Sequence, residues 1–212
     1  MPKITKIEIQ KNNKDRVNIY LDGEYALAIN AELIYKENLK VKDDVDISKL
    51  QEIAEKESYI RCKESAIKII ERSYKTEKEI RDNLKQKGYE EKQINNSIDF
   101  LKEYNFINDN TYAKAFIKDK LSSKGSQKIK YDLMKKGIAK DIIEENLIKV
   151  DKNEEKEVAL NVGRKKYESI RRKESDNYKL SGKLYRFLIS RGYAYDIVKD
   201  VVKEIMSLDE FE

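Results

Sequence analysis

Residues 80–89 read IRDNLKQKGY, and the same pattern returns as IKYDLMKKGI at residues 129–138 and as LYRFLISRGY at residues 184–193. In each copy two apolar residues stand four apart, and the second stands four residues before a glycine. Apolar residues at this spacing line one face of a helix, and a glycine just past them supplies the left-handed position that ends it. Each copy is therefore predicted to be a helix that stops at Gly88, Gly137 or Gly192.

The apolar pattern continues on both sides of each glycine. After Gly88 it gives Ile94, Ile98 and Leu101, with matching residues in the other two copies. A further amphipathic stretch precedes each copy, clearest at residues 66–70 and 112–117. The unit is then three short helices, and intervals of roughly 50 residues suit tandem helical units that bury their faces against one another.

Polar residues mark where several of these helices begin. Thr76 and Glu79 have the spacing of a capping box, and Gly125-Ser126 is expected to form the corresponding turn and N-cap in the second copy. Asn108 or Asp109 is expected to cap the helix that follows. Residues 165–178 are predicted to be an insertion before the second helix of the third copy.

The first 46 residues have a different period. Apolar and polar residues mostly alternate over residues 3–30, which is typical of half-buried strands. Turns are expected at Asn12-Asn13 and at Asp22-Gly23, the second being a strong hairpin signal. This segment is predicted to be a three-stranded antiparallel meander, followed by a short helix over residues 31–35. A long helix is predicted from Ile47 to about Tyr74.

The fold prediction is a mainly α-helical protein, with three tandem three-helix repeats in an elongated array behind a small antiparallel β-segment. The expected divisions are an N-terminal β meander with a short helix, a first repeat, a second repeat and a third repeat. Their boundaries are placed at residues 1–46, 47–107, 108–152 and 153–212.

Composition narrows the class of protein. The 212 residues include no histidine and one cysteine, Cys62, which excludes ordinary zinc sites and histidine-based catalytic triads. No glycine-rich phosphate-binding motif is present, so a nucleotide-binding loop is not expected. We therefore expect no catalytic residues, no metal and no cofactor. The chain also shows no long apolar run and no signal peptide, so we expect a cytoplasmic protein without a membrane segment.

Positive charge is concentrated in the second and third repeats. Residues 118–140 hold eight lysines against two acidic residues, and residues 161–191 hold ten basic residues against three acidic ones. Tyrosines lie among them, at positions 131, 167, 178 and 185. Such a face is suited to a phosphate backbone or to an acidic protein groove, and the simpler interpretation is a set of solvated helices.

Four segments in this order resemble the RecX family, regulators of the bacterial recombinase RecA: SYKTEKEIRDNLKQKGY, FINDNTYAKAFI, KGSQKIKYDLMKKGI and KLYRFLISRGYAYDIV. The segment NIYLDGEYALAI is similar to the additional β-segment of the longer members. One departure is that Ser126-Gln127 follows Gly125 where the family has a Gly-Pro-Arg-like step, with Lys124 and Lys128 on either side.

The resemblance implies a non-enzymatic regulator in DNA repair and recombination. It implies that the protein binds RecA and the RecA–single-stranded DNA filament, lies in the filament's helical groove and limits filament growth, strand exchange and ATP turnover. Weak direct DNA binding and a monomeric state are expected. The residues expected on the binding face, chosen by charge alone, are Lys124, Lys128, Lys130, Lys135, Lys136, Arg164, Lys165, Lys166, Arg171, Arg172, Arg186 and Arg191.

Other classes stay open at this point. A helical-repeat scaffold would bind a protein partner without meeting nucleic acid. A sequence-specific DNA-binding regulator is a further possibility, since three-helix units can resemble helix-turn-helix modules. An enzyme would need a carboxylate site for which the sequence gives no spacing.

Overall fold

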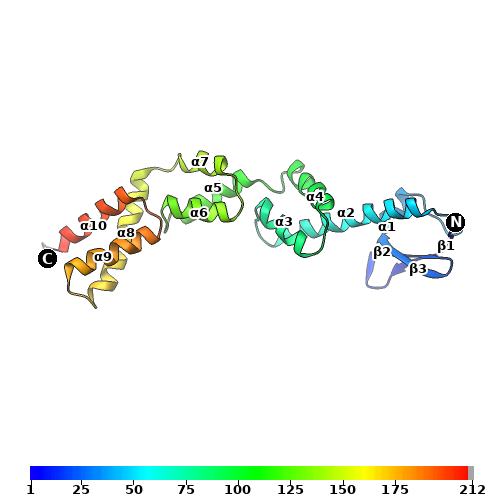
Figure 1. Ribbon diagram of the computed structural model, residues 1–212, viewed down its shortest axis with the longest axis horizontal. Coiled ribbons are helices and arrows are strands. Elements are labelled where there is room, and N and C mark those ends of the chain that lie inside the picture. The colour runs from blue at the N-terminus through cyan, green and yellow to red at the C-terminus, as the bar shows by residue number, and fades with distance from the viewer. Residues whose placement is uncertain (210–212) are drawn as a thin grey trace. The chain divides into compact units, whose positions relative to one another are not determined.

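Figure 1 shows the computed structural model of the chain, which describes residues 1–209. These residues form three strands and ten helices in two compact units. The first unit comprises Met1–Tyr74 and Ile80–Phe106, and the second comprises Lys75–Glu79 and the chain from Ile107 onward. Among the described helices, none is long and apolar enough to cross a membrane.

The three strands form an antiparallel sheet in the order β1-β2-β3, as predicted. Strand β1 spans Ile4–Gln10, β2 spans Asn13–Leu21 and β3 spans Glu24–Asn30. Asp22 and Gly23 have φ values of 48° and 92°, the left-handed pair that a two-residue hairpin turn requires. The first turn lies one residue earlier than predicted, because Asn13 already pairs with Gln10 as part of β2.

The sheet packs on two helices of the first unit. Helix α1 spans Ala31–Lys36, and α2 spans Ile47–Arg72 without a break, which confirms the predicted long helix. Ile19, Ile29 and Ile53 are fully buried between the sheet and α2. The buried Glu57 carboxylate of α2 accepts hydrogen bonds from the Arg16 guanidinium and the Asn30 amide, so a charged group also ties the sheet to the helix.

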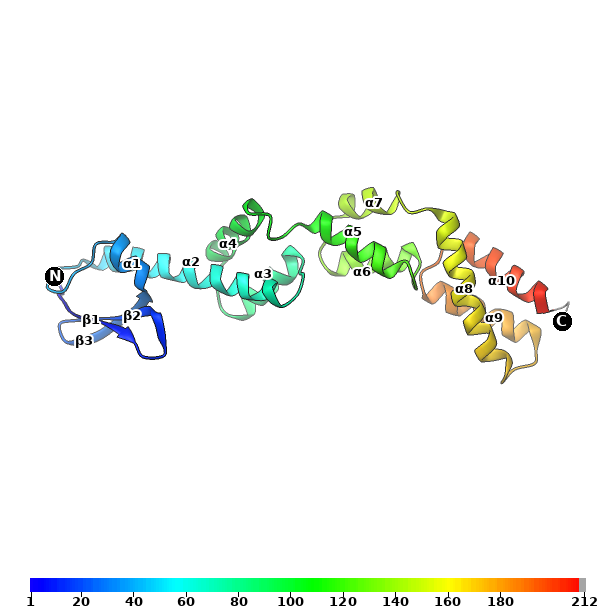
Figure 2. The same cartoon turned by 180° about the vertical axis from the view of Figure 1, so that it is seen from behind.

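Helix α2 and the helices that follow it form three repeats (Figures 1 and 2). In the first repeat, α2 is followed by α3 (Glu77–Gln86) and α4 (Glu91–Glu103). The second consists of α5 (Asp109–Lys120), α6 (Ser126–Lys135) and α7 (Lys140–Leu147). The third consists of α8 (Lys152–Arg171), α9 (Asn177–Ser190) and α10 (Tyr195–Asp209).

The three repeat glycines end the second helix of each repeat, as predicted. Gly88, Gly137 and Gly192 have φ values of 83°, 83° and 85°. The residue after each glycine donates its amide to the carbonyl of the leucine five positions earlier, at 3.2–3.3 Å. This is the hydrogen bond of a Schellman helix end. The three leucines that accept it, Leu84, Leu133 and Leu188, have fully buried side chains.

The predicted insertion in the third repeat is mostly helix, which corrects that expectation. Residues 165–171 continue α8, because Tyr167 and Ile170 extend the face begun by Ala159 and Gly163 and no glycine or proline interrupts them. The loop that remains is residues 172–176. Helix α9 then starts at Asn177, with Asp176 accepting from the Lys179 amide as N-cap.

The cap predictions were mostly correct. Thr76 and Glu79 form the expected capping box, each side chain accepting from the other residue's amide at 3.3 and 3.1 Å. Asn108 is the N-cap of α5 and accepts from the Thr111 amide at 3.0 Å. Gly125 is the N-cap of α6 and, having no side chain, makes no capping hydrogen bond. The Ser126 hydroxyl bonds to Glu155 of the third repeat, as described below.

Candidate nucleic-acid and protein interface

In the second unit, the glycine turn of the third repeat touches the start of α6 in the second repeat. The Gly125 amide donates to the Arg191 carbonyl at 3.0 Å, and the Gln127 amide donates to the Gly192 carbonyl at 3.1 Å. The Ser126 amide and hydroxyl both donate to the Glu155 carboxylate of α8 at 2.7 Å. The two repeats are therefore joined largely through backbone groups.

The start of α3, which belongs to the second unit, meets the glycine turn of the second repeat in the same way. The Thr76 hydroxyl donates to the Lys136 carbonyl at 2.7 Å, and the Lys78 ammonium donates to the Lys135 carbonyl at 3.3 Å. The Glu77 amide donates to the Asp109 carboxylate at 3.0 Å, as the Ser126 amide does to Glu155. We call such a contact, between the first residues of the second helix of one repeat and the glycine turn of the next repeat, a helix-start joint.

Basic and aromatic side chains gather around the joint between the second and third repeats. In α6 the ammonium groups of Lys128 and Lys135 lie 5.0 and 4.8 Å from the centre of the Tyr131 ring. In the third repeat the Lys166 ammonium and the Arg191 guanidinium lie 5.3 and 5.1 Å from the centre of the Phe187 ring. Cations within about 6 Å of a ring centre are attracted by the ring's quadrupole.

The joint links the segments that carry the two groups, because Gly192 lies against the backbone of Lys128 and follows Arg191 directly. We call this set the basic–aromatic cluster: Lys128, Tyr131, Lys135, Lys166, Phe187 and Arg191. It draws on α6, α8 and α9, so neither repeat forms it alone. Arg191, Lys135 and Tyr131 are exposed, and the other three side chains are half-buried.

Four of the predicted binding residues lie outside this cluster and pair with carboxylates on their own or other helices. Lys130 pairs with Glu144 of α7 at 2.9 Å, and Arg164 pairs with Glu204 of α10 at 3.5 Å. Lys136 pairs with Glu79 at the other joint at 2.7 Å, and Arg171 pairs with Glu168 at 3.4 Å. Lys165, Arg172 and Arg186 are exposed and form no ion pair with a described residue.

Lys124 lies beside the cluster and is held by Asp132. The Lys124 ammonium is 2.8 Å from one carboxylate oxygen of Asp132, and the Lys128 ammonium is 3.3 Å from the other. Burial alone would raise the pKa of the Asp132 carboxyl, but the hydrogen bonds from the two lysines outweigh it and hold this pKa below its usual value. Asp132 therefore carries a negative charge within this basic surface.

Sequence reasoning missed one aromatic residue here and misplaced another. It made no prediction for Phe187, although the spacing of Phe187 from Arg191, four residues along α9, is the signal that places the two side chains on one helix face. Tyr167 was expected beside the cationic face, but it is only 3% exposed and belongs to the core of the third repeat. It follows Gly163 by four residues and so lies on the buried face of α8.

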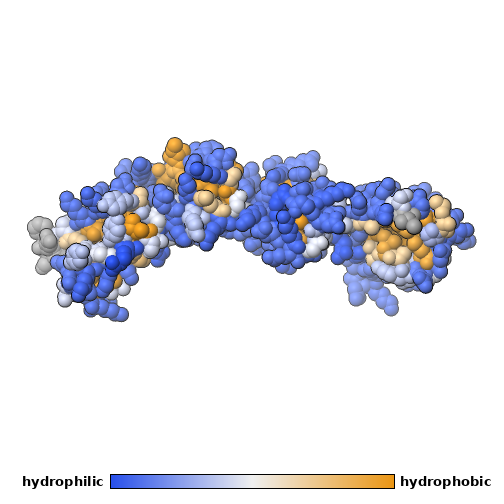
Figure 3. All heavy atoms as spheres, viewed as in Figure 1, coloured by the Kyte–Doolittle hydropathy of each residue, from blue (hydrophilic) through white to orange (hydrophobic). Residues whose placement is uncertain are grey.

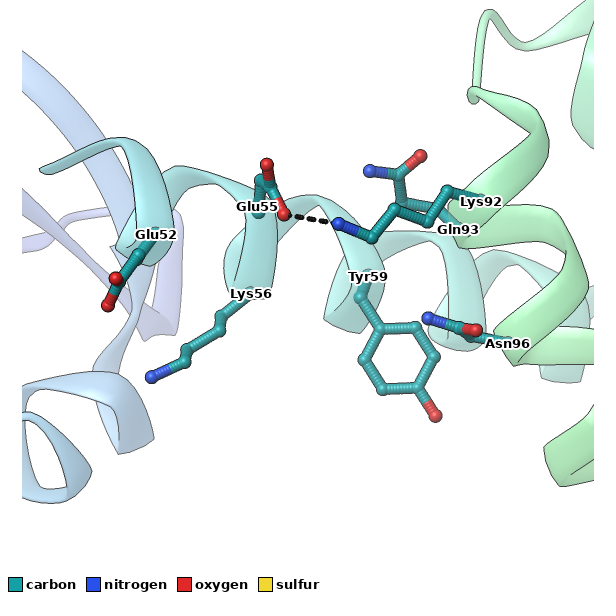
Figure 4. Close-up of a pocket in the computed structure, with 7 residues that line it drawn as sticks. All are labelled: Glu52, Glu55, Lys56, Tyr59, Lys92, Gln93 and Asn96. Carbon is teal, nitrogen blue, oxygen red and sulfur yellow. Dashed lines mark hydrogen bonds and ion pairs between the residues drawn. The ribbon is translucent and has the colours of Figure 1, made fainter. Parts of the chain in front are cut away.

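The first unit offers a different kind of surface. A pocket of about 250 Å³ lies between α2 and α4, where Tyr59 and Asn96 form part of the wall (Figure 4). Lys92 reaches across to Glu55 at 2.7 Å, and the remaining charged residues of the lining are one acidic and one basic side chain. Because its charges balance, this pocket has no excess of cations to attract a phosphate.

Apolar side chains also reach the surface. The face drawn in Figure 3 is largely hydrophilic, with apolar side chains gathered over α7 and over the N-terminal sheet. Ile148 at the end of α7 is 84% exposed, and Ile9 in β1 is 63% exposed.

Three three-helix repeats in tandem, with basic and aromatic side chains where the second meets the third, define a tandem helical-repeat protein. Sequence models of four RecX domains match the chain: the Regulatory protein RecX N-terminal domain at residues 2–46 and the first, second and third three-helix domains at residues 62–101, 108–147 and 153–202. The chain belongs to the RecX family of regulatory proteins.

Relatives support this assignment over the full length. The Regulatory protein RecX of Clostridium beijerinckii is 59% identical over 209 residues, covering 99% of this chain and 98% of that protein. The Regulatory protein RecX of Clostridioides difficile is 36% identical over 99% of this chain and 98% of its own length. The match therefore includes the β-segment as well as the three repeats.

Solved structures share the fold. A crystal structure of regulatory protein RecX covers 95% of this chain and 98% of its own with a TM-score of 0.75, at 24% identity. RecX from Lactobacillus salivarius covers 70% of this chain and 96% of its own with a TM-score of 0.61, at 25% identity.

Proposed function

We propose that this protein is a non-enzymatic regulator of RecA that binds the RecA–single-stranded DNA filament in its helical groove. Binding there limits filament growth, strand exchange and ATP turnover during DNA repair and recombination. Membership of the RecX family supports the regulatory role. The single observation that carries the binding mode is the basic–aromatic cluster, which two repeats build together.

The chemistry of the cluster suits a surface that carries phosphate. Four cations stand on two aromatic rings, so their charges are fixed in place while their outer sides face solvent. A cationic surface of this kind is attracted to a nucleic-acid backbone without reading its sequence, and the attraction falls with salt. The filament groove, which holds DNA and protein together, would present both phosphate and acidic side chains to it.

The test is the single-stranded-DNA-dependent ATPase of RecA from the same source, with this protein added from substoichiometric to equimolar amounts. We expect a dose-dependent fall with the unmodified protein. The fall should be lost in a triple variant of the cluster, Lys135→Glu, Lys166→Glu and Arg191→Glu.

A matched control reverses three other exposed cations: Lys165→Glu, Arg172→Glu and Arg186→Glu. It changes the net charge equally but leaves the cluster intact, so inhibition should persist. Inhibition that survives the first variant and disappears in the second would move the binding face to the outer side of α8 and α9. No inhibition by the folded, unmodified protein would reject the RecA proposal.

A protein-binding scaffold is the alternative, and the many internal ion pairs favour it. Lys124, Lys128, Lys130 and Lys136 all have carboxylate partners within the chain, which lowers the charge left for DNA. A scaffold of this kind would bind its partner without DNA and would show no salt-dependent affinity for an oligonucleotide.

A further inference from the structure

Asp132 holds two lysines of the binding surface at once. Its carboxylate has one oxygen 2.8 Å from the Lys124 ammonium and the other 3.3 Å from the Lys128 ammonium. The Asp132 side chain is 18% exposed, whereas those of Lys124 and Lys128 are 28% and 37% exposed. The carboxylate therefore lies beneath the two ammonium groups, which remain open to solvent on their outer sides.

This position is central to the surface. Lys128 also stands over Tyr131, and its backbone lies against Gly192 in the helix-start joint. Lys124 precedes Gly125, whose amide bonds to the Arg191 carbonyl in the same joint. Lys135, Lys166 and Arg191, in contrast, form no ion pair with a described carboxylate. The surface thus contains two cations that share one carboxylate, next to three cations without a carboxylate partner among the described residues.

We propose that Asp132 is an internal counter-anion that occupies the place of a phosphate between Lys124 and Lys128 and so weakens direct binding of single-stranded nucleic acid. This inference rests on the proposed function for the identity of the surface, and it assigns that surface a built-in limit on affinity. A phosphate that approaches the two lysines must share them with a carboxylate that is already hydrogen-bonded to both. It therefore releases fewer counterions than two free lysines would, and gains less from binding.

The test is Asp132→Asn, which keeps the side chain's shape and removes its charge. Binding of a fluorescent polythymidine oligonucleotide is measured by anisotropy at several salt concentrations. We expect affinity to rise several-fold at low salt. We also expect the slope of log K against log salt to steepen by about 0.7, because removing one carboxylate leaves one more net positive charge for a phosphate contact on a single strand.

Glu144→Gln is the matched control. Glu144 also contacts two lysines, Lys130 at 2.9 Å and Lys140 at 3.8 Å, but on α7 and away from the cluster. It produces the same change in net charge, so equal gains in the two variants would overturn the proposal in favour of a general charge effect. Weaker binding by Asp132→Asn would overturn it too, because Asp132 would then position the lysines for binding. Failure of both the variant and the unmodified protein to bind the oligonucleotide would likewise overturn it.

A second pair of variants keeps the proposal testable if Asp132→Asn is unstable. Because Asp132 already holds the Lys124 ammonium, Lys124→Gln should reduce oligonucleotide affinity much less than Lys135→Gln, which removes a cation without a described carboxylate partner. Equal losses would contradict the proposal. The RecA ATPase separates this inference from the proposed function: tighter DNA binding by Asp132→Asn, with no effect of the unmodified protein on RecA, would uphold the counter-anion and reject the RecA role.

Discussion

Gly192 in the third repeat lies so close to Lys128 in the second that a β-carbon on Gly192 would overlap the Lys128 backbone nitrogen. Gly125 is equally restricted, since a β-carbon there would overlap the Gly192 carbonyl. Two glycines thus let the backbones of two repeats touch and exchange hydrogen bonds directly. Gly88 has the same left-handed conformation, but nothing would lie within 4 Å of a β-carbon there.

Replacing these glycines by alanine should separate conformation from contact. Gly88→Ala is expected to cost about 1–2 kcal/mol, the penalty for a left-handed non-glycine residue. Gly192→Ala carries the same penalty together with an overlap worth about 1–3 kcal/mol, so it should be clearly the more destabilising. Urea unfolding of the two variants measures both losses. Equal losses would mean that the joint tolerates a side chain.

Removing the hydroxyl group should change the stability of the protein in opposite directions for the two tyrosines that follow Gly88 and Gly192. The Tyr193 hydroxyl is buried without a hydrogen-bond partner among the described residues, and burial, followed by the nearby Glu155 carboxylate, raises the pKa of Tyr193 to about 12. Tyr193→Phe should therefore stabilise the protein by about 1 kcal/mol.

The comparison is Tyr89→Phe. The Tyr89 hydroxyl is 2.9 Å from the Ser65 hydroxyl and donates to the Arg61 carbonyl at 3.1 Å, so its removal should cost about 1 kcal/mol. Thermal and urea unfolding of both variants give the two signs. A loss in Tyr193→Phe would show that its hydroxyl has a partner in solution.

The ion pair at the first helix-start joint should make stability depend on acidity. Burial raises the pKa of the Glu79 carboxyl, but the Lys136 ammonium and the Thr76 amide outweigh burial and lower this pKa below its ordinary value. A carboxyl with a lowered pKa stabilises the fold above the unfolded-state value, about 4.3, and that contribution is lost as the pH falls through the folded-state pKa. Glu79→Gln should therefore reduce stability at pH 7 and leave it nearly unchanged below about pH 3, as urea unfolding between pH 7 and pH 2.5 would show.

Glu155 should matter for the second joint far more than its neighbour Glu154. Glu155 is 7% exposed and accepts from both the amide and the hydroxyl of Ser126, so Glu155→Ala leaves two donors without their charged acceptor. We expect a loss of about 1.5–3 kcal/mol. Glu154 is exposed, and Glu154→Ala should change stability by less than about 0.5 kcal/mol. Similar losses in the two variants would argue against Glu155 as a bond across the joint.

The parts of the fold set by local spacing could be predicted from the sequence. The helix ends at Gly88, Gly137 and Gly192 depend on residues within a few positions, as do the Thr76–Glu79 capping box and the Asp22-Gly23 turn. The joints could not, because they pair residues 29 to 66 positions apart in the chain, and many of the groups that bond are backbone amides and carbonyls, which leave no mark on side-chain periodicity.

The candidate site was less accessible to sequence reasoning for a related reason. A count of charges cannot tell Lys130, which pairs with Glu144, from Lys135, which stands free over Tyr131. Nor can it tell a buried aromatic side chain, such as Tyr167, from a half-buried one that lies beneath cations, such as Phe187. Both distinctions depend on which helix lies alongside.

The two helix-start joints follow the same order along the chain. In each joint the glycine turn belongs to the later repeat and the helix start to the earlier one, so the Gly88 turn takes part in neither joint. In the third repeat, α9 begins a turn earlier than α3 and α6 relative to its glycine, and the buried Leu180 stands where Thr76 and Gly125 offer a helix start. The third repeat thus has no helix start at the position that a glycine turn contacts in the other two repeats. The contact that joins the second and third repeats therefore has no equivalent that the third repeat of one copy could offer to the Gly88 turn of another.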